Sequence, residues 1–320
     1  FVSLDRITMA DYLRGKRWLD CQPLRWYVNY CCRDDYGAGI ERVSAWAGIH
    51  YFASRHGLAA NANDNAVLTW PDGLHHLAAK MLPPPQQLLD GFALHINEQS
   101  DSVNVLSMDS SSHKIINLKA KRVICATPLH VTKHLLPQLQ TDGIDWQHDM
   151  PAHAPWLVSN FYLDTFPQEL KGYDLAWDNV VYGSPHLGYV VATHQWLRAA
   201  KPQYTVFTAY HAFNSASMAT RQWLSKASTS ELLHIGIADL KTAYGKQLWT
   251  SIKGVELCVR GHAMASPTVG FLNNKSREYL QQADGRILFA HSDLSGYSIF
   301  EEAAWWGYQA AKHIIEQDLG

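Results

Sequence analysis

The spacing of hydrophobic and polar residues changes several times along the chain, and each change predicts a different element. The opening third is rich in aromatic residues with helical spacing, and it ends at a polar stretch with turn chemistry, Asn61–Asn65, where we place a domain boundary. Pro71 follows and can begin a helix, which we expect from Asp72 to about Met81. The three prolines Pro83–Pro85 should end that helix.

A run of short strands is predicted next. Residues 93–96, 103–108 and 114–118 are apolar runs separated by polar turns, which is typical of a small meander or hairpin. The continuous apolar run Val123–Ala126 is expected of a strand buried on both faces. Thr127 is placed as the N-cap of a helix with Pro128 at its first position, so this segment predicts a strand-to-helix unit of an α/β sheet.

The second half predicts further strands and two helices. Residues 154–164 and 204–210 are strand-like, and 230–245 form an amphipathic helix closed by Gly245. The last unit is a strand, Arg286–Ala290, followed by a helix from about Ile299 to Ile315.

The last helix begins with a capping box, because Ser298 is followed three residues later by Glu301. Its N-terminus lies beside the loop His291–Ser292–Asp293, which follows a strand. Ligands of α/β sheets bind at the carboxyl ends of strands and often at helix N-termini, so this loop is a candidate ligand site. A well-packed core helix without a ligand would show the same local pattern.

The composition narrows the class of protein. The chain has 320 residues, of which 47% are hydrophobic and 18% charged, as in soluble globular enzymes. The net charge of -2 and the lack of a Lys/Arg run argue against a nucleic-acid partner. No apolar stretch reaches the roughly 18 residues of a membrane span, so we expect a soluble protein, with a cytoplasmic or periplasmic location left open.

Several candidate sites have simpler interpretations. The five cysteines form no C-x-x-C pair, so we expect free thiols, with Cys125 in the core. His130 and His134 are spaced for one helix face, but no further ligand completes a metal set, so no metal site is predicted. Asp34 and Asp35 are adjacent and their side chains should diverge, which favours a solvated or capping role over a two-carboxylate hydrolase.

The C-terminal part of the chain resembles a known protein family. The segment RILFAHSDLSGYSIFEEAAWWGYQAA (286–311) resembles the C-terminal flavin-binding segment of the FAD-dependent amine oxidase superfamily, the flavin-containing amine oxidoreductases. Segments similar to other parts of that family follow its order: LTWPDGLHHLAAKM (68–81), KRVICATPLHV (121–131) and GHAMASPTVG (261–270). RDDYGAG (33–39) resembles the substrate-domain insertion of its bacterial branch.

The resemblance implies an α/β fold, with an incomplete FAD-binding domain of the glutathione-reductase-like type and an α+β substrate domain. Residues 1–66 would be a helical part of the substrate domain, 67–128 part of the FAD domain, 129–262 the rest of the substrate domain, and 263–320 the C-terminal part of the FAD domain.

The resemblance also implies the site residues. Asp293 would bind a ribityl hydroxyl of FAD, the backbone around Ser298 and Ile299 would face the flavin pyrimidine end, and Tyr297 would be the catalytic residue, one wall of an aromatic cage over the flavin. The cofactor-binding residues are then Thr127, Pro128, Ala290, His291, Ser292, Asp293, Ser298 and Ile299.

Three departures from the family pattern stand out. His291 occupies the position of the family's usual glycine, and residues 153–164 contain no counterpart of the lysine that many members hold near flavin N5. No G-x-G-x-x-G fingerprint is present, and Gly37–Ala38–Gly39 follows no apolar strand. We therefore expect this chain to be the C-terminal portion of such a protein, with an N-terminal piece missing from the sequence.

The resemblance implies an FAD-dependent oxidoreductase that transfers a hydride from an amine, or a related small or hydrophobic substrate, to flavin. The resemblance implies dioxygen as the electron acceptor. Two alternatives stay open. One is a non-catalytic binding or assembly protein that retains the fold, and the other is a flavin-dependent desaturase or isomerase acting on a hydrophobic isoprenoid.

Overall fold

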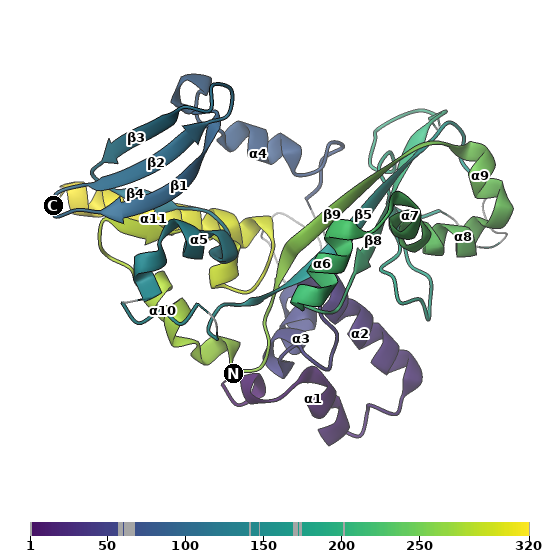
Figure 1. The fold of residues 1–320 in the computed structure, drawn as a ribbon. Coiled ribbons are helices and arrows are strands. Elements are labelled where there is room, and N and C mark those ends of the chain that lie inside the picture. Colours follow the sequence, from purple (N-terminus) through teal and green to yellow (C-terminus); the bar gives the residue numbers. More distant parts are fainter. Residues whose placement is uncertain are drawn as a thin grey trace. The chain divides into compact units, whose positions relative to one another are not determined.

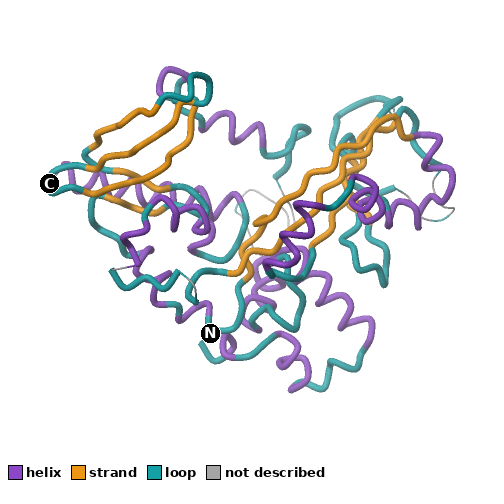
Figure 2. Tube along the Cα trace, viewed as in Figure 1, coloured by secondary structure: helices purple, strands orange, loops and turns teal. Residues whose placement is uncertain are grey.

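The computed structural model describes residues 2–56, 60, 68–140, 142–146, 148–168, 172, 175–200 and 202–319. Apart from the first two residues, the chain divides into two compact units. The first unit contains residues 3–81 and 153–269, and the second contains 82–152 and 270–320. Figures 1 and 2 show the elements of each unit.

The first unit is built on a five-stranded sheet with the strand order β6-β7-β8-β5-β9. The pairs β5–β8, β6–β7 and β7–β8 are antiparallel, with Phe161 opposite Phe207 in the first of these pairs. Side chains along β8 alternate between buried and half-buried, as expected of a strand with one covered face. The strands are β5 (Ala152–Leu163), β6 (Asp178–Asn179), β7 (Tyr189–Val191), β8 (Thr205–Ala212) and β9 (Ile252–Ser266).

Eight α-helices among the described residues belong to the first unit, and α7 packs on β8 and β9. Side-chain caps begin several of them: Thr8 accepts from the amide of Asp11, and Ser228 forms a capping box with Glu231. The helices are α1 (Met9–Gly15), α2 (Gln22–Tyr36), α3 (Ala45–Ala53), α4 (His75–Met81), α6 (Met218–Lys226), α7 (Thr229–Gly236), α8 (Ala238–Tyr244) and α9 (Leu248–Ser251). Short 3-10 helices are η1 (Leu4–Arg6), η2 (Ser54–His56) and η5 (Gly245–Gln247).

Two helix predictions need correction. The helix expected from Asp72 begins only at His75, after a turn at 71–74, and ends at Met81 before the prolines as predicted. The single helix expected over 230–245 is two helices, α7 and α8, which meet at Ile237. The break directly follows Gly236, where a Cβ would collide with Ser159 of β5, so close packing on the sheet fixes the end of α7.

The second unit contains two small sheets. The strands β1 (Gly91–Glu98), β2 (Val103–Asp109) and β3 (Ile115–Ala120) form an antiparallel sheet in the order β1-β2-β3, which confirms the predicted meander. The strands β4 (Val123–Cys125) and β10 (Ile287–Phe289) pair in parallel, as expected of the strand-to-helix units of an α/β fold.

Three α-helices accompany these sheets: α5 (Leu129–Leu135), α10 (Lys275–Gln281) and the long α11 (Phe300–Leu319). Leu129 and Leu135 of α5 share a buried cluster with Ile96 of β1 and Phe289 of β10, so this helix joins the meander to the parallel pair. The 3-10 helices of this unit are η3 (Pro85–Gln87), η4 (Pro137–Gln140), η6 (Phe271–Asn273) and η7 (Ser292–Leu294).

The boundaries of the compact units differ from the expected segment boundaries. They fall at 81/82, 152/153 and 269/270, instead of 66/67, 128/129 and 262/263. Residues 129–152 lie in the second compact unit together with 82–128 and 270–320, because α5 and η4 pack into the core of that unit. The predicted boundary at 61–65 lies outside the described residues.

Within the described parts of the chain, none of the helices combines the length and the apolar character that crossing a bilayer requires.

Replacing Gly236 with Ala tests the packing of α7 on the sheet. In an open helix position Gly→Ala stabilises by up to about 1 kcal/mol. Here we expect a loss of about 1–3 kcal/mol, because the new methyl group meets Ser159. Urea unfolding measures the change. Gly307→Ala on α11 is the matched control, because a Cβ there meets nothing within 4 Å. Equal effects of the two substitutions would contradict the packing account.

Candidate functional site

The predicted site residues follow two neighbouring parallel strands. Val123, Ile124 and Cys125 of β4 pair with Ile287, Leu288 and Phe289 of β10, and the Ala290 amide donates to the Cys125 carbonyl at 3.1 Å. The loops 126–128 and 290–299 therefore leave the sheet at the same edge. This is the carboxyl edge, where α/β sheets bind ligands. The structure thus brings together Thr127–Pro128 and Ala290–Asp293.

Asp293 connects the two loops. Its side chain is 2% exposed, and Oδ2 accepts a hydrogen bond from the Leu129 amide at 2.9 Å. Leu129 is the first residue of α5, and the N-cap residue is Pro128, not Thr127 as predicted. Proline offers no side-chain acceptor, so the carboxylate from the other strand caps the helix in its place. The sequence indicated a ligand role for Asp293 but gave no sign of this structural one.

His291 lies directly against Asp293. Its Nδ1 accepts from the Asp293 amide at 3.1 Å and lies 3.3 Å from Asp293 Oδ1. Nδ1 cannot accept from the amide and donate to the carboxylate at once, so the two contacts need the ring proton in different places. In either state the imidazole occupies the position beside Oδ1 that a ligand hydroxyl would use.

The hydroxyl of Thr127 contacts other side chains of the protein and is not simply exposed on the loop. Its hydroxyl lies 3.0 Å from the Thr132 hydroxyl and 3.3 Å from the Cys125 thiol. Cys125 is buried and free, which confirms the predicted core thiol, and the other four cysteines are free as well. Thr127 therefore anchors the turn between β4 and α5.

The start of α11 is held by side chains that the sequence did not single out. Ser295 Oγ donates to Glu302 Oε2 at 2.5 Å and accepts from Trp306 Nε1 at 2.6 Å. The Ala303 amide donates to the Ile299 carbonyl, so the N-cap position falls on Ile299, one residue later than the predicted capping box requires. Tyr297 and Ser298 are half-buried and Ile299 is exposed.

Arg277 of α10 fixes the loop from the other side, and sequence reasoning missed it. Its guanidinium is buried and donates to the backbone carbonyls of Phe271, Leu272 and Leu294. Gln281 also donates to the Leu294 carbonyl, at 2.8 Å. All these acceptors are backbone oxygens, which every residue has. The sequence therefore contains no particular residue type that would predict these contacts of Arg277.

Two features of the structure require glycine at position 296, the backbone conformation and the lack of room for a side chain. Its φ of +75° lies in the left-handed region, and a Cβ would come within 2.6 Å of the Phe271 ring. The loop can therefore turn into α11 against Phe271 only with glycine at this position.

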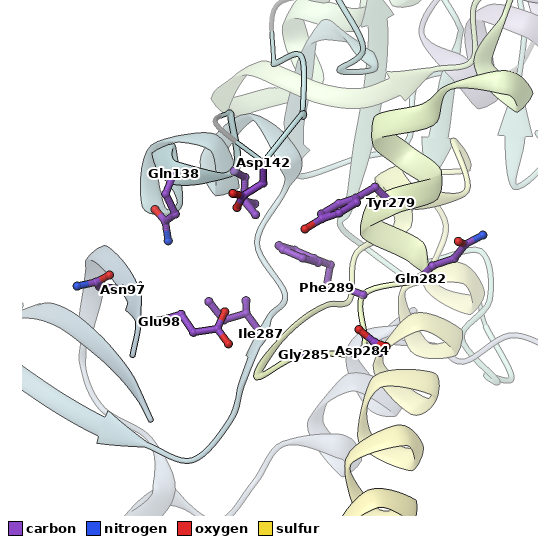
Figure 3. Close-up of a pocket in the computed structure, with 12 residues that line it drawn as sticks. Asn97, Glu98, Gln138, Asp142, Tyr279, Gln282, Asp284, Gly285, Ile287 and Phe289 are labelled. Atoms are coloured by element: carbon purple, nitrogen blue, oxygen red, sulfur yellow. The ribbon is translucent and has the colours of Figure 1, made fainter. Parts of the chain in front are cut away.

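A pocket of about 430 Å³ opens at the other end of β10 (Figure 3). Ile287, Phe289 and Leu139 contribute apolar surface, and Glu98, Asp142 and Asp284 contribute carboxylates. None of the predicted site residues lines this pocket. The carboxylates would repel a pyrophosphate, so the pocket does not suit the phosphates of a dinucleotide.

The string Gly37–Ala38–Gly39 has a structural role. Gly37 follows helix α2 with φ +62°, as a helix C-cap, and the Gly39 amide donates to Asn214 Oδ1 at 2.5 Å. A dinucleotide turn follows a strand, whereas this string follows helix α2, in agreement with the absence of an apolar strand before it in the sequence. Among the described residues, the turns that follow β4 and β10 contain no glycine before Gly296.

Comparisons with known proteins establish the fold. The sequence matches no family model, and no curated protein is significantly similar to it. The structure is similar to wild-type putrescine oxidase bound to putrescine, with a TM-score of 0.68 and 16% identity over 98% of this chain and 69% of that one. A putrescine oxidase variant from a redesign of cofactor binding gives 0.70 at 16% identity, with the same coverage. Reduced UDP-galactopyranose mutase gives 0.56 at 9% identity, over 91% of this chain and 62% of that one.

These neighbours are FAD-binding proteins. The chain therefore has a flavin amine-oxidase-like α/β fold, which confirms the sequence resemblance at the level of the fold.

Replacing Gly296 with Ala should destabilise the second unit. The left-handed backbone costs about 1–2 kcal/mol for a residue with a Cβ, and displacing the Phe271 ring should add about 1–3 kcal/mol. Gly270→Ala is the matched control, because Gly270 also has a positive φ but a Cβ there meets nothing within 4 Å. Urea unfolding of both variants gives the comparison. A Gly296 variant no less stable than the Gly270 variant would contradict the contact with Phe271.

Proposed function

We propose that this chain is an FAD-dependent oxidoreductase of the amine-oxidase type, with the second unit as its FAD-binding domain and the first as its substrate domain. The observation that carries the proposal is the buried carboxylate of Asp293, held where two parallel strands end, in a chain with the fold of FAD-binding amine oxidases. The glutathione-reductase-like type of this domain is part of the same proposal.

The residues at this edge fit the flavin end of FAD. Asp293 offers Oδ1 to a ribityl hydroxyl while Oδ2 keeps its bond to the Leu129 amide. The backbone at Ser298 and Ile299 lies at the start of the 20-residue helix α11, where amide groups and the helix dipole favour the electron-rich pyrimidine edge. When bound, FAD supplies the hydride acceptor, and dioxygen is the proposed final acceptor.

The residues at this edge of the sheet are less suited to the phosphate end of FAD. A pyrophosphate is usually bound by a glycine-rich turn that leads into a helix N-terminus. The described turns after β4 and β10 carry Thr127–Pro128 and Ala290–Asp293 instead, and the second of these contains a carboxylate. The proposal therefore assigns only the flavin and ribityl contacts to these residues.

Tyr297 is the proposed catalytic residue on the substrate side. It is half-buried and lies between Gly296, which fixes the turn, and the start of α11. An aromatic face there would orient an uncharged amine and stabilise the positive charge that develops as the amine is oxidised.

The direct test is an absorbance spectrum of the purified chain with FAD, followed by a panel of amines under anaerobic conditions. The proposal predicts a bound flavin spectrum that an amine bleaches. If the protein binds no flavin, the proposal is contradicted. If it binds flavin but no amine bleaches the flavin spectrum, only the cofactor part of the proposal holds.

Replacing Asp293 tests the ribityl contact. Asp293→Asn can still accept from the Leu129 amide but loses the charge, so FAD binding should weaken by about 1.5–3 kcal/mol, the range for a hydrogen bond to a charged group. Asp293→Ala should weaken FAD binding as much and also lose about 1 kcal/mol of stability with the helix cap. FAD titration by fluorescence and urea unfolding separate the two effects.

His291→Gly is the matched variant in the opposite direction. Removing the imidazole takes away its contact with Oδ1 of Asp293, so FAD should bind more tightly than to the parent chain. Unchanged FAD affinity in both Asp293→Asn and His291→Gly would remove Asp293 from the cofactor site.

Tyr297→Ala should impair turnover and leave the flavin spectrum largely intact, because the residue is proposed to position the substrate and not the cofactor. Steady-state rates per bound flavin measure this effect. Loss of flavin together with normal turnover per remaining flavin would instead show that Tyr297 only packs the start of α11.

A further inference from the structure

A cavity of about 320 Å³ lies in the first unit, outside the residues assigned to the flavin. It is formed by α7, α8 and α9, which follow one another along the chain (Figure 1), and α8 packs against both of its neighbours. None of the predicted site residues lines it. The cavity is therefore a separate candidate site.

The cavity follows one continuous helix face. Leu233, Ile237 and Lys241 line it and are four residues apart, so their side chains point the same way. The helical spacing continues through the junction of α7 and α8, because the Ile237 amide donates to the Leu233 carbonyl at 3.0 Å and the Lys241 amide donates to the Ile237 carbonyl at 2.8 Å. Trp249 of α9 adds a side chain from the next helix.

The floor of the cavity is apolar. Leu233, Ile237 and Ala238 contribute hydrocarbon surface, and Ile237 is the most deeply buried of them, at 4% exposure. The indole of Trp249 is 50% exposed, and no ring of a described residue packs against it. A ligand that covers this surface removes it from water, which favours binding. An exposed indole beside an apolar floor is suited to an aromatic ligand.

The rim of the cavity carries positive charge. Ser230, His234 and Lys241 are its polar residues, and all three are exposed. Within the described residues, no hydrogen bond or ion pair engages the side chain of any of them. The ammonium group of Lys241 and the ring N–H group of His234 are therefore available to an acceptor.

The nearby acids are engaged elsewhere and do not line the cavity. Glu231 forms the capping box of α7 with Ser228. Asp239 is 4% exposed and accepts two hydrogen bonds from the segment 184–188. The charge of Lys241 is therefore left without a carboxylate partner in the part of the chain that the structure describes, and a ligand can supply one.

We propose that this cavity binds a small aromatic carboxylic acid in its ionised form. The carboxylate accepts from Lys241 and His234, and the ring lies on the indole of Trp249 over the apolar floor. A carboxylate and an ammonium group make the stronger, charge-assisted kind of hydrogen bond. The volume suits an acid of about ten non-hydrogen atoms, because 320 Å³ equals about ten water molecules at the roughly 30 Å³ that each occupies in the liquid.

The lining argues against other classes of ligand. A divalent metal ion needs several oxygen ligands, and no carboxylate lines the cavity. A nucleic acid is held by several cations, whereas Lys241 is the one lysine or arginine among the described residues of the lining. An organic ammonium ion is repelled by Lys241. An aromatic acid uses both the charge at the rim and the apolar floor.

Calorimetric titration of the chain without FAD tests the proposal. The probe is sodium 3-phenylpropionate at about pH 7, where a carboxylic acid is ionised, and the neutral probe of the same shape is 3-phenylpropanamide. The acid should bind with a Kd of about 1 mM, as expected of so small a ligand at an open site. The amide should bind at least about fivefold more weakly. No binding of the acid up to about 10 mM, or equal binding of the amide, would overturn the proposal.

Two variants locate the binding site. Lys241→Gln removes the charge and Trp249→Ala removes the ring, so each should weaken binding of the acid at least about fivefold. The matched controls are Lys80→Gln, at an exposed lysine of α4, and Trp18→Ala, at an indole that is 49% exposed. Neither control residue lines the cavity, so affinity should stay unchanged. Full binding by Lys241→Gln or by Trp249→Ala would overturn the proposal.

Lys241→Arg separates recognition of the charge from an effect on the fold. Arginine keeps the positive charge, so this variant should bind the acid nearly as well as the parent chain. A loss as large as that in Lys241→Gln would contradict the proposed contact. All the residues tested lie in the first unit and the titrations use no FAD, so failure of the flavin proposal leaves this result unaffected, and the reverse also holds.

Discussion

The hydrogen bond from the Leu129 amide to Asp293 is the interaction on which the candidate site depends. It joins the end of β10 to the first turn of α5, and α5 in turn packs between the meander and the parallel strand pair. The carboxylate is almost fully buried, so its position is fixed by this bond and by the packing around it. Any ligand at this edge of the sheet meets an acceptor that the fold has already oriented.

The rest of the loop is held in the same way, by contacts to backbone groups. Arg277 and Gln281 bind the Leu294 carbonyl, and Ser295 is held between Glu302 and Trp306. A loop fixed at several points loses little further entropy when a ligand binds. His291 is the exception, because its ring lies beside Oδ1 of Asp293, the oxygen proposed to meet a ribityl hydroxyl.

The sequence predicted what depends on local pattern. Short apolar runs separated by polar turns predicted the meander, and a continuous apolar run predicted strand β4, which precedes one of the candidate loops. Features that depend on distant partners were not predictable. They are the end of α7 at Gly236, which packs on Ser159, the capping of α5 by Asp293, and the contacts of Arg277 with backbone carbonyls. The half-burial of Asp34 was not predictable either, because one of the charges that act on its carboxylate, Asp178, comes from a distant part of the chain.

Hydrogen exchange with and without FAD tests the central claim most directly, because it locates the ligand as well as detecting it. The account predicts that FAD slows amide exchange at residues 290–299 and at 127–129, the two loops that Asp293 joins. In Asp293→Asn this protection should be reduced at both loops together. FAD binding that leaves both loops unprotected, or protection confined to the carboxylate-lined pocket at the other end of β10, would contradict the account.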